Sequence, residues 1–322
     1  MPDRKKLTVS YAPFWHDGSR ISTKHYHIMA ATLLAVIAGL LRYGMPALGV
    51  LALSVGSAMA WEYLMNRVTR RPVSIGDGNA ALIGLLFGML LPAVIPWWVV
   101  ITGTFVGVVI GKQIYGGIGG NPFNPVAVAY AILMISWPIY FDFNAALVDY
   151  PFEFTAAYPL VLMKAYGSAG IESFSLVDLL LGRQTGGIGA TFGLGLLIGG
   201  VYLMIRGFIR WEIAVSFLAG VLVSALCFNL YNPEVYAGPG VHLLTGFTLM
   251  GAFFLATEDS SSPVHFIPML IYGALGGVLT VLIRNQGAHV DGVIYAILII
   301  NLVHPLIDKI RPKATGRVMH HA

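Results

Sequence analysis

The chain has 322 residues, of which 57% are hydrophobic and only 11% are charged. A soluble domain carries about 25% charged residues, so the composition excludes a soluble enzyme and predicts a polytopic membrane protein. The apolar runs are long and continuous rather than alternating, which predicts an all-α fold. The net charge of +4 fits basic cytoplasmic segments of a membrane protein, and no nucleic-acid partner is expected.

About ten transmembrane helices are predicted, in two groups of five, at roughly 20 apolar residues per span. The expected spans are 28–44, 47–65, 80–96, 98–115 and 125–141, then 191–208, 212–230, 242–257, 265–283 and 292–308. The domain organisation that follows is a cytoplasmic segment 1–27, a first half 28–141, an extracytoplasmic loop 142–190, a second half 191–308 and a cytoplasmic tail 309–322.

The basic residues predict the orientation of these spans. Fifteen of the 19 Lys and Arg residues fall on one face, and only Arg42, Lys164, Arg183 and Arg284 fall on the other. Under the positive-inside rule the richer face is cytoplasmic. Both termini are therefore expected in the cytoplasm, and the loop 142–190 is expected outside.

The two groups of five spans resemble each other in sequence. Residues 78–84 (GNAALIG) are similar to 240–246 (GVHLLTG), and YAIL occurs at both 130–133 and 295–298. Two matching halves with an odd number of spans each must be inverted, and such folds place a binding site near the midplane between the repeats. Chance recurrence of Gly and Leu in apolar sequence is the alternative.

Residues 115–125 (YGGIGGNPFNP) lie between the fourth and fifth predicted spans. The four glycines would let the backbone approach a flat ligand closely. Asn121 and Asn124 can each donate and accept hydrogen bonds, which suits the edge of a heterocycle. A cytoplasmic turn with Asn124 as a helix cap explains the same residues without a ligand.

Residues 183–191 (RQTGGIGAT) come directly before the sixth predicted span. Thr191 is expected at a helix N-terminus on the outer face, where free N–H groups and the helix dipole favour a phosphate. Gly186, Gly187 and Gly189 would leave space for it. The alternative is that Thr191 is an ordinary N-cap.

Residues 251–263 (GAFFLATEDSSSP) end the eighth predicted span in an acidic loop. Because this loop is expected on the cytoplasmic side and has no basic residue, its acids are unusual there. Glu258 and Asp259 either pair with a neighbouring protein, serve cations or protons, or lie in a solvated loop.

Ionisable residues within or near the spans are costly and often functional. However, Glu62 can pair with Arg67 at the interface, Lys112 can extend from its helix end toward water, and Asp291 can cap the tenth span. Their roles stay open at this point.

The cysteine content limits the redox chemistry. Cys227 is the single cysteine, so the chain holds neither an iron–sulfur cluster nor an intrachain disulfide. His242 and His304 could ligate a haem, but hydrogen bonding within the bundle is the preferred explanation. No metal site and no complete catalytic site are expected on this chain.

Four motifs carry a resemblance to a known family. Residues 116–125, 251–259, 181–191 and 291–298 (DGVIYAIL) resemble the RnfD/NqrB family of ion-translocating oxidoreductase subunits. The likeness is closer to the Rnf branch than to the branch found in the sodium-pumping NADH:quinone oxidoreductase, and it covers essentially all the predicted spans. It implies ten spans in two inverted halves and an FMN joined to a threonine through a phosphoester.

The family's flavin-binding residues map onto this sequence position by position. The flavinylated threonine ends a motif usually written Ser/Thr-Gly-Ala-Thr, which corresponds to Ile188 through Thr191, so Thr191 is the expected FMN site. Ile188 departs from the usual hydroxyl residue. The resemblance also implies a second, non-covalent flavin, such as riboflavin, near Asn121 and Asn124.

The function implied is electron transfer within an ion-translocating ferredoxin:NAD+ oxidoreductase in a bacterial or archaeal cytoplasmic (inner) membrane. Expected partners are the Rnf subunits A, B, C, E and G, the flavin transferase and membrane lipid. Alternatives are a channel or secondary transporter with the same inverted-repeat fold, and a scaffold that only assembles the complex.

Overall fold

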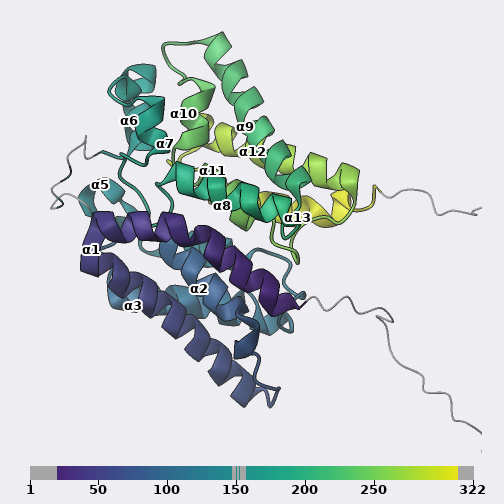
Figure 1. Ribbon diagram of the computed structural model, residues 1–322. Helices are drawn as coiled ribbons and strands as arrows, with labels where there is room; N and C mark the ends of the chain where they lie inside the picture. Colours follow the sequence, from purple (N-terminus) through teal and green to yellow (C-terminus); the bar gives the residue numbers. More distant parts are fainter. Residues whose placement is uncertain (1–19, 147–149, 151, 153–156, 311–322) are drawn as a thin grey trace, which may run out of the picture.

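The computed structural model describes residues 20–146, 150, 152 and 157–310, and all regular structure within them is helical (Figure 1). Most of the predicted N-terminal segment and C-terminal tail, with part of the loop 142–190, lies outside the described residues. The helices are α1 (Ile21–Val68), α2 (Asn79–Leu90), α3 (Trp97–Phe105), α4 (Pro125–Ser136), α5 (Phe143–Ala146), α6 (Pro159–Tyr166), α7 (Leu176–Leu180), α8 (Gly193–Ile205), α9 (Trp211–Tyr231), α10 (Pro239–Leu244), α11 (Thr248–Met250), α12 (Phe266–Gln286) and α13 (Val293–Ile307). The prediction of an all-α fold is confirmed for this part of the chain.

The first two predicted spans form one interrupted helix, α1. Its 48 residues would extend about 72 Å at 1.5 Å per residue, more than twice the thickness of a bilayer core. Gly44, with φ 66° and ψ −146°, breaks the helical geometry, and Pro46 follows within the next turn. The break divides α1 into two spans, near the predicted boundary between 28–44 and 47–65.

Among the described residues, four helical segments are long and apolar enough to cross a membrane: Ile21–Val68, Trp97–Tyr115, Trp211–Tyr231 and Phe266–Gln286. In the region of the predicted span 80–96, α2 has only 12 residues, Asn79–Leu90, and buried, irregular backbone follows at Leu91. The predicted span 242–257 is likewise interrupted between α10 and α11, where Gly246 has φ 63°. Pro92 and Gly246 supply the local reason, since one lacks an N–H and the other favours positive φ.

Two short π-helical segments occur at Val106–Ile110 and Gly251–Leu255. Both are mostly buried, and each leads toward one of the motif loops, 115–125 and 257–263. Such π segments are frequent at functional sites. A functional site is therefore expected where these two loops meet.

Small residues allow the two halves of the chain to pack closely. A Cβ on Gly199 of α8 would lie 2.1 Å from the carbonyl oxygen of Ala31 on α1, and a Cβ on Gly39 would lie 2.0 Å from that of Ile188. Within the second half, a Cβ on Gly277 of α12 would likewise lie 2.1 Å from the carbonyl oxygen of Phe217 on α9. This use of glycine is typical of helix interfaces in membranes.

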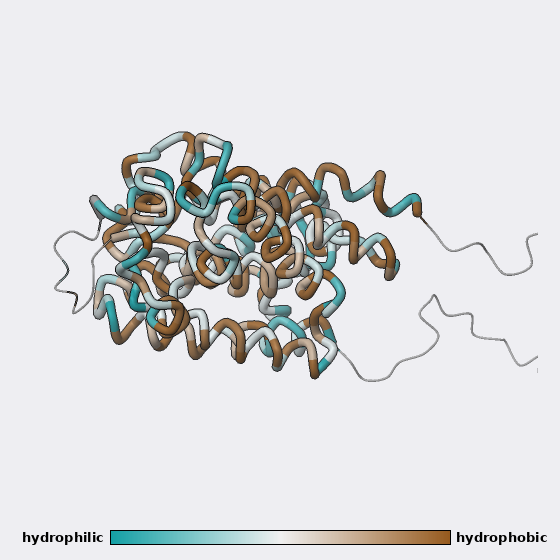
Figure 2. Tube along the Cα trace, turned by 90° about the horizontal axis from the view of Figure 1, so that it is seen from above, coloured by the Kyte–Doolittle hydropathy of each residue, from teal (hydrophilic) through white to brown (hydrophobic). Residues whose placement is uncertain are grey.

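The helices divide into two groups in space. In Figure 1, α1, α2 and α3 lie in the lower part, whereas α8, α9, α12 and α13 lie above them. The start of α1 and the end of α13 lie at the same, right-hand end, and α5, α6 and α7 lie at the opposite end. Hydrophobic residues predominate along the helices, with hydrophilic residues gathered mainly at turns and helix ends (Figure 2).

Candidate functional site

The segment 183–191 folds into the protein. Residues 184–191 are all buried, and their backbone pairs with the end of α2, where Ile188 N donates to Leu91 O (3.0 Å) and Gly189 N donates to Met89 O (2.9 Å). The last carbonyls of a helix have no partner within the helix. The segment supplies those partners at the point where α2 stops, and we call it the acceptor turn.

The glycines of the acceptor turn differ in what they face. A Cβ on Gly187 would lie 2.7 Å from Leu90 O, and one on Gly189 would lie 2.6 Å from the Met89 side chain. These two glycines therefore permit close packing against α2. A Cβ on Gly186 would instead lie 2.7 Å from the Thr191 methyl group and 3.8 Å from the Tyr158 ring.

Thr191 lies two residues before the first residue of α8 and is 5% exposed. Its Oγ1 accepts a hydrogen bond from Nη1 of Arg42, 149 residues earlier in the chain, at 3.1 Å. Arg42 was not among the predicted site residues. The available signal was its position, because it is one of four basic residues assigned to the outer face and it lies inside an apolar helix.

Several buried polar atoms in or next to the acceptor turn have no hydrogen-bond partner. They are Gln184 Oε1, Thr185 Oγ1 and both ring nitrogens of His242. Gln184 belongs to the same region as α10, because its Nε2 donates to Leu244 O at 2.9 Å. Buried polar groups are normally satisfied by protein, water or ligand, so this region has donors and acceptors to offer a polar group.

A cavity of about 360 Å³ lies at the same end of the molecule as the acceptor turn. Six of its lining residues are aromatic: Tyr130, Phe141, Phe143, Tyr158, Phe247 and Tyr295. The hydroxyl of Tyr295 is buried without a partner. Tyr158 links the cavity to the acceptor turn through its approach to Gly186, and burial together with Asp291 raises its pKa well above the ordinary value.

Asp291 has a structural role beside this cavity. It pairs with Arg284 at 2.8 Å, accepts from the backbone N–H of Phe247 (2.8 Å), and accepts from that of Val293 (3.2 Å) at the start of α13. The N-cap of α13 is Gly292, so Asp291 lies one residue before the cap, and its main role is the buried ion pair with Arg284.

Asn121 and Asn124 meet the acidic loop at the other end of the molecule. Asn121 Nδ2 lies 3.2 Å from Glu258 Oε1 and also donates to Phe123 O at 3.0 Å. Asn124 caps α4, because its Oδ1 accepts from Val126 N and Ala127 N, and its Nδ2 donates to Leu255 O. The motifs 115–125 and 251–263 thus form one site, a proximity that separate motifs could not reveal.

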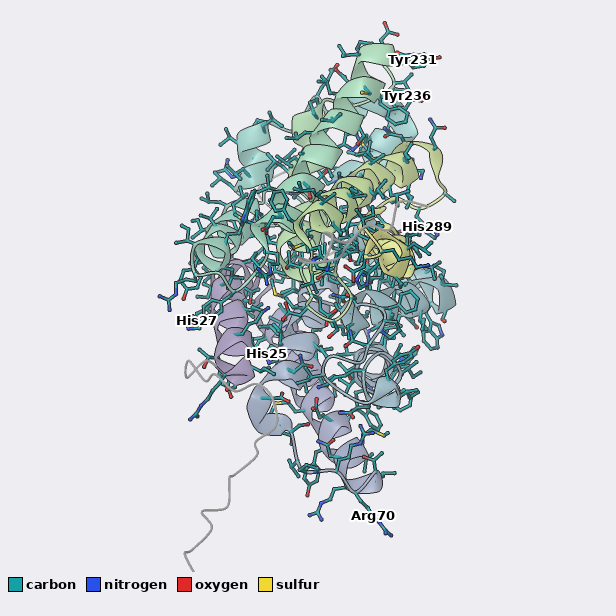
Figure 3. The ribbon with its side chains drawn as sticks, turned by 90° about the vertical axis from the view of Figure 1, so that its right-hand side faces the viewer. His25, His27, Arg70, Tyr231, Tyr236 and His289 are labelled. Atoms are coloured by element: carbon teal, nitrogen blue, oxygen red, sulfur yellow. The ribbon has the colours of Figure 1, made fainter. Side chains whose placement is uncertain are left out.

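Both asparagines line a cavity of about 130 Å³ at this end. Its other polar lining residues include Lys24, His25, Asn79, Lys112 and Glu258. Figure 3 views the molecule from this side, with His25 on the first turns of α1. Polar and apolar side chains thus both line this cavity, and Asn121 and Asn124 are themselves buried.

Glu62 and Lys112 form a buried ion pair near this cavity. Lys112 Nζ lies 2.7 Å from Glu62 Oε2, and the Lys112 and Glu62 side chains are 2% and 0% exposed. The predictions that Glu62 pairs with Arg67 and that Lys112 extends toward water are therefore wrong. Arg67 donates to Tyr63 instead, because the Glu62 side chain faces the interior, where Lys112 is brought by the end of the π segment.

Comparison with known proteins gives the family of the chain. Residues 8–316 match the NQR2, RnfD, RnfE family. The chain belongs to this family. It is similar to the D subunit of the ion-translocating oxidoreductase complex of Cronobacter sakazakii, with 34% identity over 96% of this chain and 98% of the relative.

Two further relatives of the NQR2, RnfD, RnfE family have more specific names. The D subunit of the proton-translocating ferredoxin:NAD(+) oxidoreductase complex of Clostridium ljungdahlii is 34% identical over 94% of each chain. The D subunit of the Na(+)-translocating ferredoxin:NAD(+) oxidoreductase complex of Acetobacterium woodii is 33% identical over 94% of this chain and 93% of the relative. The resemblance found in the sequence motifs is confirmed, and the chain is a multi-pass membrane protein.

Proposed function

We propose that the chain is the D-type membrane subunit of an ion-translocating ferredoxin:NAD+ oxidoreductase complex and that it transfers electrons by means of bound flavin. Two relatives with this name are similar to the chain over nearly their whole length. The other Rnf subunits would be its partners and would supply the ferredoxin and NAD+ sites. The coupling ion, Na+ or H+, is not assigned.

The proposed cofactor of the outer end is FMN joined to Thr191 through a phosphoester. A flavin accepts and releases electrons, and the protein positions and tunes it. The observation that carries the proposal is the hydrogen bond from Arg42 to Thr191 Oγ1, the atom that would bear the phosphate. The orphaned polar atoms of the acceptor turn and the aromatic wall near Tyr158 also suit a polar chain and a planar ring.

A second, non-covalent flavin is proposed at the cavity lined by Asn121 and Asn124. Support comes from the mixed lining of that cavity, which includes the apolar residues Ile83 and Phe254 beside the polar ones. Because Asn124 caps α4, its part would be to shape the cavity, whereas Asn121 and Glu258 would offer polar contacts.

We also propose ten spans in two inverted halves, with both termini in the cytoplasm. The matching helices α4 and α13 support the inversion, since they run antiparallel. At the start of α4, Asn124 N donates to Oδ1 of Asn301 in the last turns of α13, whereas Tyr130 and Tyr295 line the cavity at the opposite end. The interruptions at Leu91 and at Gly246 fall in corresponding segments of the two halves.

Flavin fluorescence on a denaturing gel tests the covalent attachment. Protein from cells that contain a flavin transferase should remain fluorescent after denaturation, and Thr191→Ala should abolish the band. Thr69→Ala, an exposed threonine at the end of α1, is the control and should stay fluorescent. A wild-type protein without a fluorescent band would exclude the covalent flavin.

A further inference from the structure

Two consecutive residues of α1 contact the acceptor turn. Arg42 Nη1 donates to Thr191 Oγ1 at 3.1 Å, and Tyr43 Oη donates to Gly186 O at 3.3 Å. The break at Gly44 follows immediately. α1 therefore presents a guanidinium to the hydroxyl at one end of the turn and a phenol to the carbonyl near its middle.

The burial of Thr191 sets an electrostatic requirement for any phosphate attached there. A phosphodiester carries one negative charge, and Thr191 is only 5% exposed. A buried anion without a compensating partner is strongly unfavourable. A guanidinium is well suited to this task, since it is planar, always charged and able to donate two hydrogen bonds to phosphate oxygens.

The other three basic residues assigned to the outer face are held elsewhere. Lys164 donates to the carbonyls of Gly287 and His289. Arg183 pairs with Asp178, and Arg284 pairs with Asp291. Although Arg183 is close to Thr191 in sequence, it is Arg42 from a distant helix that reaches the hydroxyl.

We propose that Arg42 and Thr191 form a phosphate site in which Arg42 neutralises the phosphodiester of a flavin nucleotide. The inference rests on the covalent flavin proposed above and adds the positioning residue for its phosphate. In the ester, Thr191 Oγ1 bears phosphorus in place of its proton, so it donates to no neighbour, and Arg42 donates to the phosphate group. A free phosphate or a lipid headgroup has the same chemistry, and the test separates these sources.

The test compares flavin-loaded and unloaded full-length protein, purified in detergent from cells with and without a flavin transferase. The variants are Arg42→Gln, Arg42→Lys and Thr191→Ala. Arg183→Gln is the matched control. It removes a guanidinium from the same region, but this guanidinium pairs with Asp178. In-gel fluorescence measures loading, and the thermal unfolding midpoint is the second readout.

Loading should raise the wild-type unfolding midpoint by about 1–2 °C, the shift expected for a gain near 1 kcal/mol in a chain of 322 residues. Arg183→Gln should keep this rise. Arg42→Gln should lose or reverse it, because the phosphodiester then lacks its partner, and Arg42→Lys should keep part of it. An Arg42→Gln protein with the wild-type rise would overturn the proposal.

Three other outcomes are also decisive. If Arg42→Gln remains unlabelled, labelling of Arg42→Lys supports a role for the positive charge. If neither variant is labelled, although both unfold at the wild-type midpoint without flavin, the role of the charge is overturned. Inorganic phosphate and anionic lipid vesicles are also added to the unloaded Thr191→Ala protein and to the double variant Thr191→Ala, Arg42→Gln. If they stabilise the single variant but not the double variant, the site binds a free anion and the ester is not its ligand. An unlabelled wild type refutes only the covalent flavin itself.

Discussion

At the scale of single residues, the buried charges are arranged as pairs. Glu62 with Lys112 and Arg284 with Asp291 are each almost fully buried. An ionised group in a low-dielectric interior is tolerated when it is paired and hydrogen-bonded. Each pair thus joins separate segments of the fold, and the Glu62–Lys112 pair connects α1 to the end of the segment after α3.

Breaking the Glu62–Lys112 pair should destabilise the protein strongly. Lys112→Met leaves the buried Glu62 carboxylate without its opposite charge, with only the Ser74 hydroxyl still donating to it, so the free energy of unfolding should fall by about 3–5 kcal/mol. Glu62→Gln combined with Lys112→Met should recover part of this loss. Chemical unfolding in detergent measures both.

The exposed pair Lys24–Asp259 is the control for this prediction, with side chains 25% and 69% exposed. Lys24→Met should change the free energy of unfolding by no more than about 1 kcal/mol. Equal losses in Lys112→Met and Lys24→Met would contradict the importance of burial.

At the scale of the helices, interruption and close approach place the acceptor turn. α2 stops at Leu90, which leaves carbonyls for Ile188 and Gly189 to occupy. α8 follows the turn and lies against α1 through Gly199. The contact of the turn with α2 and the contact of α8 with α1 both involve backbone atoms. The position of Thr191 therefore depends on glycines, which place no side chain at these contacts.

Gly199→Ala should destabilise the protein, whereas Gly49→Ala should not. The added methyl at Gly199 would lie 2.1 Å from Ala31 O, but nothing lies within 4 Å of one at Gly49. The expected loss at Gly199 is about 1–3 kcal/mol, and Gly49→Ala on α1 should gain about 0.5–1 kcal/mol from helix propensity. Unfolding midpoints of the two variants should therefore move in opposite directions. Movement in the same direction would argue against the close contact of α1 with α8.

At the scale of the whole molecule, the two ends differ in what they present. The aromatic cavity and the acceptor turn share one end, and the cavity of Asn121 with the acidic loop lies at the other. Flavins at both places would put one redox group near each membrane surface. The proposed arrangement allows electrons to cross between the two faces within a single protein chain.

Cysteine labelling tests the orientation. Cys227 is exposed and is the single cysteine, so its replacement by Ala provides a background for Trp211→Cys and Tyr231→Cys, at the two ends of α9. These positions are 50% and 85% exposed. A membrane-impermeant maleimide should label Tyr231→Cys from outside intact cells and Trp211→Cys only after permeabilisation. The reverse pattern would overturn the proposed orientation.

Composition and local pattern were enough to predict an all-α membrane protein, and the resemblance of four motifs to known proteins predicted its family. These features depend on short stretches of sequence. The length of an apolar run determines whether it can span a bilayer, and a glycine motif determines the local backbone conformation. The early end of α2, by contrast, was missed, since an apolar run reads the same whether its backbone is helical or pairs with a distant turn.

Contacts between distant segments were decided only by the tertiary structure. Arg42 reaches Thr191 across 149 residues, Asn121 meets Glu258 across 137, and Lys112 rather than Arg67 pairs with Glu62 across 50. A charged side chain in an apolar helix signals that a partner exists but does not identify it. The partner depends on which helix faces pack together and where α1 bends at Gly44, and both are properties of the assembled bundle.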